Sequence, residues 1–248
     1  DSKDEFQLLG SSFNEMAEDL ETHFRVMTAI NRIGLALSAE KDTGRLLEII
    51  FQGAKNITAA DGGVLYTVNE KKLELVSVQI DSLGGTKATE SVERLVPLYD
   101  EAGKPNLSLV AAYSVNKGRT ISIPDIYNAD GFDLSWHMAF DRNTGYRSKS
   151  FLSVPLRDHE NEIIGVLQLV NALDRRAGST AAFSDEDQRV VETLASQAAV
   201  AMTKNKLLED FKQLFDSLTE LIATAIDEKS DYTGDHCRRV PVLAMMLA

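Results

Sequence analysis

The chain has 248 residues, of which 44% are hydrophobic and 26% are charged, a composition typical of a folded protein rather than a disordered one. Its 26 basic and 38 acidic side chains give a formal net charge of −12, which argues against binding to nucleic acid or to anionic lipid, because both select basic surfaces. The single cysteine, Cys237, excludes an internal disulfide, a cysteine-rich zinc site and an iron–sulfur cluster, and is typical of a reducing compartment.

An amphipathic helix is predicted near the N-terminus, over residues 6–30. Its seam positions recur at alternating spacings of three and four residues, as the contact line of a two-stranded coiled coil requires; they are Phe6, Leu9, Phe13, Met16, Leu20, His23, Met27 and Ile30. A helix that packs only on its own domain is the alternative interpretation. The four heptads favour the coiled coil, and hence a parallel homodimer.

The middle of the chain mixes helices with strands. Helices are expected over 42–58 (with Asp42 or Thr43 as the N-cap), over 106–118 and over 134–142. Alternating or continuous apolar runs predict strands over 62–68, 72–78, 95–99, 120–125, 150–156 and 163–170, the first two of which form a hairpin. The long connection over 79–119 is where functional residues are expected.

A last long helix is predicted over residues 184–228. It opens with Ser184 as the N-cap and Asp187 three positions later, a capping box, and its apolar seam continues as far as Ala225. A helix of this length is longer than one small domain can pack against, so we expect it to connect to a further unit. The apolar C-terminal segment 240–248 has no helix-ending signal, and we expect the chain to be part of a longer protein.

Three segments together give residues 26–202 a resemblance to the GAF domain family. They are RTISIPDIYNADGFD (119–133), FDRNTGYRSKSFLSVPLRDHENEIIGVLQLVNALD (140–174) and FSDEDQRVVETLASQAAVAM (183–202). The resemblance implies an α+β fold with a GAF-like antiparallel sheet and helices, flanked by long N- and C-terminal signalling helices. It also implies a ligand pocket closed by the connections over 79–142.

Some GAF domains bind cyclic nucleotides and carry an N-K…F-x-x-x-D-E signature, which is similar to Asn171, Ala172, Phe183, Asp187 and Gln188 here. In that family the lysine and the aspartate pair and brace the pocket. Ala172 replaces the lysine and Gln188 the glutamate, so this brace is lost and a cyclic nucleotide stays one candidate ligand among others.

Seven side chains are candidate ligand contacts: Asp125, Tyr127, Phe132, Trp136, Phe140, Asp141 and Arg147. The aromatic residues offer stacking surface and Arg147 suits an anionic group, although ordinary core packing for the aromatics and an ion pair of Arg147 with Asp125 or Asp141 are the alternatives. Haem ligation by His137 has only a lone histidine to support it. A covalent bilin is not expected, since Cys237 lies outside the GAF-like region.

Two terminal segments resemble other signalling modules. Residues 4–24 look like the second helix of a HAMP module, which implies an upstream membrane anchor that this chain lacks. The pattern K-S-x-Y-T-x-x-H-x-x-R-V over 229–240 looks like the opening of an HD-GYP domain, a metal-dependent cyclic di-GMP phosphodiesterase, in which His236 would be a ligand of divalent metal ions once the domain is complete. The expected division is therefore 1–25, 26–203, 204–226 and 227–248.

Two functions of different classes follow. The first is a cytoplasmic sensory and relay module that dimerises, binds a small ligand and regulates the phosphodiesterase, in a parent protein held in the inner membrane; a ligand-free dimerisation scaffold is a variant of it. The second is hydrolysis of cyclic di-GMP by this chain itself. The four histidines (23, 137, 159 and 236) show no paired metal-ligand spacing, which favours the first and predicts no catalytic residue or cofactor within the chain.

Overall fold

The computed structural model describes residues 2–84, 94–174 and 178–228, and the expected α+β fold is observed. The chain divides into two units, one up to Met202 and one from Thr203, and the sheet lies entirely in the first. Its path is β3-β2-β1-β6-β5-β4, with β7 paired to β6, and every pairing is antiparallel. The strands are β1 (Ala60–Asn69), β2 (Lys72–Ile80), β3 (Leu95–Pro97), β4 (Ile121–Ile123), β5 (Phe151–Arg157), β6 (Ile163–Leu173) and β7 (Thr180–Ala181).

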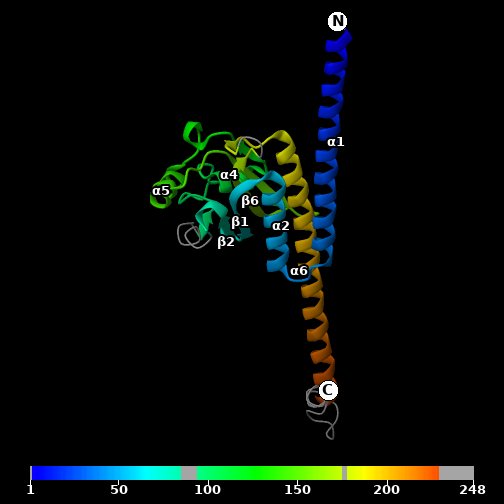
Figure 1. Cartoon of the computed structure of the whole chain (residues 1–248). Coiled ribbons are helices and arrows are strands. Elements are labelled where there is room, and N and C mark those ends of the chain that lie inside the picture. The colour runs from blue at the N-terminus through cyan, green and yellow to red at the C-terminus, as the bar shows by residue number, and fades with distance from the viewer. Residues whose placement is uncertain (1, 85–93, 175–177, 229–248) are drawn as a thin grey trace. The chain divides into compact units, whose positions relative to one another are not determined.

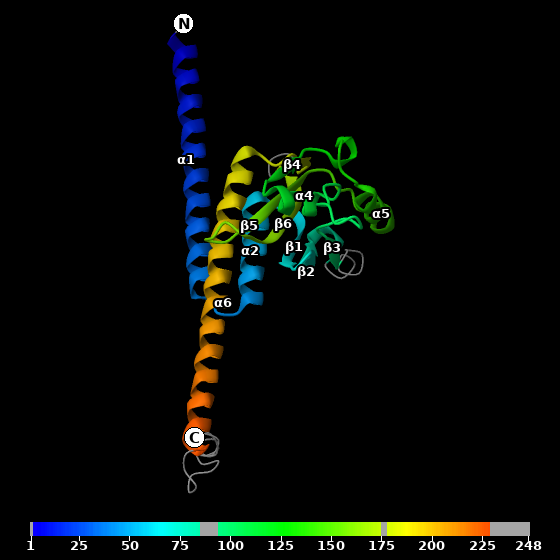
Figure 2. The same cartoon turned by 180° about the vertical axis from the view of Figure 1, so that it is seen from behind.

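Three helices cover one face of the sheet (Figures 1 and 2). They are α1 (Ser2–Ala39), α2 (Thr43–Thr58) and the first part of α6 (Asp185–Glu228). Their apolar side chains, among them Leu37, Ile50 and Leu194, form one buried cluster with strand residues such as Leu167 and Leu169. Burial of this apolar surface is the main term that holds the helices on the sheet.

Two shorter helices lie on the opposite face: α4 (Val110–Lys117) and α5 (Ser135–Thr144). The 3-10 turns η1 (Asp81–Leu83) and η2 (Ile126–Asn128) belong to the connections around them. Buried residues from this side, including Tyr66, Phe140 and Val166, make a second cluster. The sheet is thus buried on both faces, which accounts for the nearly continuous apolar sequence of β6.

Local signals fix the helix ends as the sequence predicts. The Asp42 carboxylate accepts a hydrogen bond from Arg45 N at 2.8 Å at the start of α2. At α6, Asp187 N donates to Ser184 Oγ at 3.1 Å and Ser184 N donates to Asp187 Oδ2 at 2.9 Å, so the capping box is confirmed. Helix α4 ends at Gly118, whose φ of 59° is the left-handed conformation that glycine adopts without strain.

Several elements differ from the prediction. Helix α1 runs on to Ala39, beyond the predicted end at residue 30, and β4 covers only Ile121–Ile123 of the predicted 120–125. The helix expected over 106–118 begins only at Val110, because Asn106 Oδ1 accepts hydrogen bonds from Ser108 N at 3.1 Å and from Leu109 N at 3.4 Å and holds this stretch as a loop. Strand β3 ends at Pro97, short of the predicted residue 99. Strand β7 and the two 3-10 turns were not foreseen, since each has three residues or fewer.

No helix in the described ranges combines the length and apolarity needed to cross a membrane. The segment 229–248, with His236 and Cys237, lies outside the described residues, and with it the whole HD-GYP-like pattern over 229–240.

Candidate functional site

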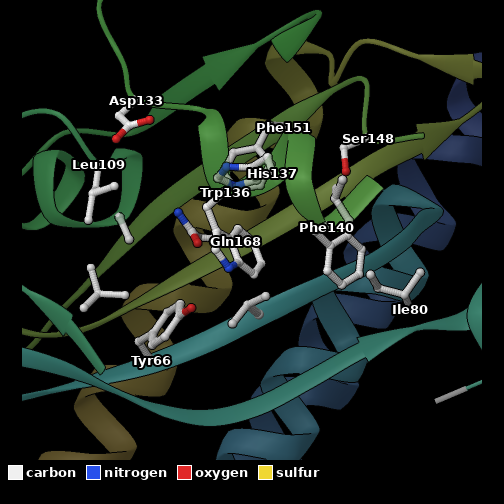
Figure 3. Close-up of a pocket in the computed structure, with 14 residues that line it drawn as sticks. Tyr66, Ile80, Leu109, Asp133, Trp136, His137, Phe140, Ser148, Phe151 and Gln168 are labelled. Carbon is white, nitrogen blue, oxygen red and sulfur yellow. The ribbon is translucent and has the colours of Figure 1, made fainter. Parts of the chain in front are cut away.

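A largely apolar pocket lies between the sheet and helices α4 and α5 (Figure 3). Its volume is about 70 Å³. The floor comes from alternate residues of the central strands, and the walls come from the connections over 80–148; the lining residues are Val64, Tyr66, Ile80, Val96, Leu109, Ala111, Asp133, Trp136, His137, Phe140, Ser148, Phe151, Gln168 and Val170. Long-range connections therefore close the pocket, as the sequence predicts.

Four aromatic rings of the wall stand close together. The ring centroid of Trp136 lies 5.0 Å from that of His137 and 5.6 Å from that of Phe140, while His137 meets the edge of Phe151 at 5.2 Å and 88°. Helix α5 supplies the first three of these side chains and β5 supplies Phe151. The two contacts of His137 are edge-to-face, an arrangement that aromatic rings favour, whereas Trp136 and Phe140 are tilted by 32°.

His137 carries an unusual polar atom in this apolar wall. Its Nδ1 is buried and has no hydrogen-bond partner. Burial lowers the pKa of His137 to about 4, against the smaller opposing influence of the Asp141 and Asp133 carboxylates. The imidazole is therefore neutral at pH 7 and has one nitrogen that accepts and one that donates.

Beside the pocket, a hydrogen-bond network ties the segment after α5 to α5 itself. The buried Asp141 carboxylate accepts bonds from Ser148 N, Ser148 Oγ and Tyr127 OH, each at 2.7 Å. The hydrogen bond to Asp141 is the largest cause that raises the pKa of Tyr127. The guanidinium of Arg147 lies 3.7 Å above the Tyr127 ring, a cation–π contact on the exposed side of this network.

A second network anchors the same segment to β6 and β1. Asn171, held at a φ of 56°, accepts a hydrogen bond from Lys149 N at 2.7 Å and donates to Arg147 O and to Tyr146 OH at 2.8 Å each. Tyr146 OH in turn donates to Asp61 Oδ2 at 2.7 Å. Burial and this bond to Asp61 raise the pKa of Tyr146. The TGYRS segment, 144–148, is thus fixed by side chains from three elements.

The structure separates the seven candidate contacts into three groups. Trp136 and Phe140 line the pocket. Tyr127, Asp141 and Arg147 form the network beside it, where Arg147 stacks on Tyr127 rather than joining any of the ion pairs found in the described ranges. The last two lie apart from the lining: Asp125 caps η2 by accepting from Tyr127 N at 3.0 Å, and Phe132 packs on Tyr113 at 5.3 Å.

Several lining residues were missed by the sequence reasoning. Gln168 is the polar residue that interrupts the apolar run 163–170 of β6, and its Nε2 donates to Ser153 Oγ at 3.3 Å; that interruption was a signal for a pocket-facing position. Asp133 and Ser148 gave no comparable signal. At the lost lysine–aspartate brace, Ala172 is buried and Asp187 is engaged by Ser184. Among the described residues, no group of three or more His, Cys, Asp or Glu side chains is arranged to hold a metal ion.

The sequence model of the GAF domain matches residues 42–202. This chain belongs to the GAF domain family. A curated relative, the dual 3′,5′-cyclic-AMP and -GMP phosphodiesterase 11A of Takifugu rubripes, is 27% identical over 163 residues, which are 64% of this chain but only 17% of that protein. The dual phosphodiesterase 11 of Drosophila melanogaster is 27% identical over 100 residues, 40% of this chain and 6% of that protein. The chain therefore spans a small part of the relatives it matches.

Solved GAF domains share the fold. The GAF domain of an Acinetobacter phosphoenolpyruvate-protein phosphotransferase is 17% identical, with a TM-score of 0.52 over 73% of this chain and 94% of that one. The free methionine-R-sulfoxide reductase of Neisseria meningitidis, solved with its substrate, is 17% identical, with a TM-score of 0.54 over 74% of this chain and 91% of that one. At these identities the likeness establishes the GAF fold and leaves the ligand open.

Proposed function

We propose that this GAF domain is a sensory and relay module, in which a small ligand bound between the sheet and α5 changes the packing of the long helices α1 and α6. One observation carries the proposal: β6 presents Val166, Gln168 and Val170 to the pocket side and Leu167 and Leu169 to the helices. A ligand that displaces this strand must alter the surface on which both helices rest.

The proposed output is an HD-GYP phosphodiesterase for cyclic di-GMP, continued beyond the C-terminus. Support for it comes from the K-S-x-Y-T-x-x-H-x-x-R-V pattern over 229–240, where His236 would bind divalent metal in the complete domain. The two cyclic-nucleotide phosphodiesterases that resemble this chain support the same arrangement, because in each of them the matching region is a small part of a larger protein. The HAMP-like segment 4–24 suggests a cytoplasmic position below an inner-membrane anchor.

A parallel homodimer is the proposed working state. Each unit has apolar side chains that water covers in the single chain: Phe13, Met16, Leu20 and Met27 on α1 are 53–67% exposed, and Phe211, Phe215, Leu218 and Ile222 on the end of α6 are 52–68% exposed. Their spacings of three and four residues match a coiled-coil seam.

Light scattering should give the mass of a dimer, and Leu20→Asp should reduce it to a monomer. Asn14→Asp, which adds the same charge off the seam, serves as the matched control; a monomeric wild type would contradict the dimer.

The competing enzyme function is tested directly. The chain is incubated with cyclic di-GMP and Mn²⁺ or Mg²⁺, beside a longer protein that includes the complete C-terminal domain. The relay proposal expects turnover only by the longer protein, because the described residues hold no metal-ligating cluster. Turnover by the present chain would overturn it.

The sensory part of the proposal is tested by ligand binding. A ligand at 100 times its dissociation constant should raise the free energy of unfolding by about 2.7 kcal/mol. Cyclic AMP and cyclic GMP are the first compounds to try, since the sequence resemblance and the relatives' names raise them. A domain that no small compound stabilises would instead be the ligand-free dimerisation scaffold.

A further inference from the structure

The volume of the pocket limits what it accepts. At about 70 Å³ it is smaller than the roughly 150 Å³ apolar cavity that binds benzene in an engineered protein, and far below the 300–1,000 Å³ usual for sites of drug-sized ligands. A single ring fits after a modest movement of the side chains that line the pocket. A nucleotide, with a base, a sugar and a phosphate, would require α5 or the surrounding connections to move.

The charge of the lining selects against anions. No lysine or arginine is among the lining residues that the structure describes, and the ionisable carboxyl there is Asp133. Hydrogen bonds from Ser135 lower the pKa of Asp133, which keeps it negative at neutral pH. Arg147, which the sequence analysis names as a contact for an anionic group, lies over the Tyr127 ring and does not line the pocket. Two backbone amides ahead of α4, those of Ser108 and Leu109, are already taken by Asn106 Oδ1. Among the described residues that line this pocket, a phosphate would meet the Asp133 carboxylate and no side-chain cation.

Among the described residues that line the pocket, His137 has a buried polar atom, Nδ1, that lacks a hydrogen-bond partner. A buried polar atom without a hydrogen bond costs free energy, and such atoms are rare in folded proteins. The imidazole makes near-perpendicular ring contacts with Trp136 and with Phe151, and turning the ring toward another partner would disturb both contacts. A ligand with a hydroxyl group satisfies this atom whichever tautomer is present, because a hydroxyl both donates and accepts.

We propose that this pocket takes a compact uncharged ring compound whose hydroxyl or N–H group hydrogen-bonds to His137 Nδ1, and that it rejects anions such as cyclic nucleotides. This inference rests on the proposed ligand-binding function and narrows it to a chemical class. His137 acts here as a specificity-determining residue, and the neighbouring aromatic rings provide the apolar contact area.

The test uses phenol and toluene, which share a ring and a similar size and differ in the ability to hydrogen-bond. Binding to the full chain is followed by the fluorescence of Trp136, the single tryptophan, excited at a wavelength where neither compound absorbs, with cyclic GMP and cyclic AMP titrated in parallel. Phenol is expected to bind with a dissociation constant on the order of 1 mM or tighter, as its few atoms allow. Neither cyclic nucleotide is expected to bind at that concentration.

A variant isolates the hydrogen bond. His137→Phe keeps an aromatic ring and removes the buried Nδ1, so the ratio of phenol affinity to toluene affinity should fall about tenfold, which corresponds to about 1.4 kcal/mol. His159→Phe makes the same change on the exposed β5–β6 turn and should leave the ratio unchanged. The difference in hydrophobicity between the two compounds is the same for both proteins, so it cancels when the ratio of the variant is compared with that of the wild type.

The outcomes separate the two proposals. Tighter binding of a cyclic nucleotide than of phenol, or an unchanged ratio in His137→Phe, would overturn this inference while leaving a ligand-binding sensor in place. No binding by any of the four compounds would overturn both. Should His137→Phe fail to fold, the comparison of phenol with the cyclic nucleotides on the unaltered chain still decides the charge selectivity.

Discussion

Replacing Asp141 tests whether the network beside the pocket holds the segment after α5 in place. In Asp141→Ala three donors lose their acceptor, and two of them, the backbone amide and the hydroxyl of Ser148, belong to a residue only 4% exposed. A buried donor left without a partner costs about 1–3 kcal/mol, whereas water can replace the acceptor of the half-buried Tyr127 hydroxyl. The free energy of unfolding should therefore fall by about 3 kcal/mol, and the melting temperature by roughly 6–12 °C for a domain of this size.

The assay is denaturant unfolding followed by the fluorescence of Trp136, which lies on the same helix as Asp141. Asp130→Ala, at an exposed position for which no hydrogen bond is found, should change the free energy of unfolding by less than about 0.5 kcal/mol and is the matched control. Asp141→Asn retains one acceptor and should fall between the two. A loss below about 1 kcal/mol in Asp141→Ala would refute the reasoning, because the Ser148 donors would then have found other partners.

Three further changes probe the site and the sheet. Acidification from pH 7 to pH 4 should lower the free energy of unfolding by at most about 3 kcal/mol through His137. The pKa of His137 falls from 6.5 to about 4 on folding, so the unfolded chain takes up the proton first as the pH falls. Equilibrium unfolding at several pH values should show a smaller loss in His137→Phe. Asn171→Ala should cost about 1 kcal/mol more than Asn171→Gly by the same measurement, because only the alanine is strained at a φ of 56°. Gly165→Ala would place a methyl group 2.5 Å from Tyr66 O across the central strand pair, so thermal unfolding should show a loss of about 1–3 kcal/mol; an unchanged melting temperature would mean that the strands separate at little cost.

The parts of the fold that the sequence predicts best are those specified locally. Helix α2 begins where Asp42 can cap it, and α6 begins at the Ser184–Asp187 box, so both starts follow from residues within four positions. Strands β5 and β6 are long apolar runs separated by a polar turn, which is also a local pattern. Helix α4 was predicted to begin too early. An asparagine is also common at an exposed helical position, so the sequence alone does not show that the Asn106 side chain binds the first amides and keeps them out of the helix.

The site was harder to predict because its wall is assembled from distant segments. Trp136 and Phe140 were found because they are aromatic residues within the connections over 79–142, which the GAF resemblance assigns to the pocket. The strand residues Val64, Tyr66 and Gln168 could not be assigned, because which face of a doubly covered strand meets the pocket depends on the tertiary arrangement. Arg147 was expected to meet an anion or a carboxylate, and a flat guanidinium stacks equally well on a tyrosine that happens to lie beneath it.

Strand β6 is a partition one residue thick. The side chain of Gln168 faces the pocket, and that of the next residue, Leu169, faces the cluster under the long helices, so only the strand backbone separates the two. Any change in side-chain volume on one face must be absorbed by the other face or by the register of the strand itself. A substitution that enlarges or shrinks a pocket-facing side chain of β6 is therefore expected to change how the helices pack on the opposite face.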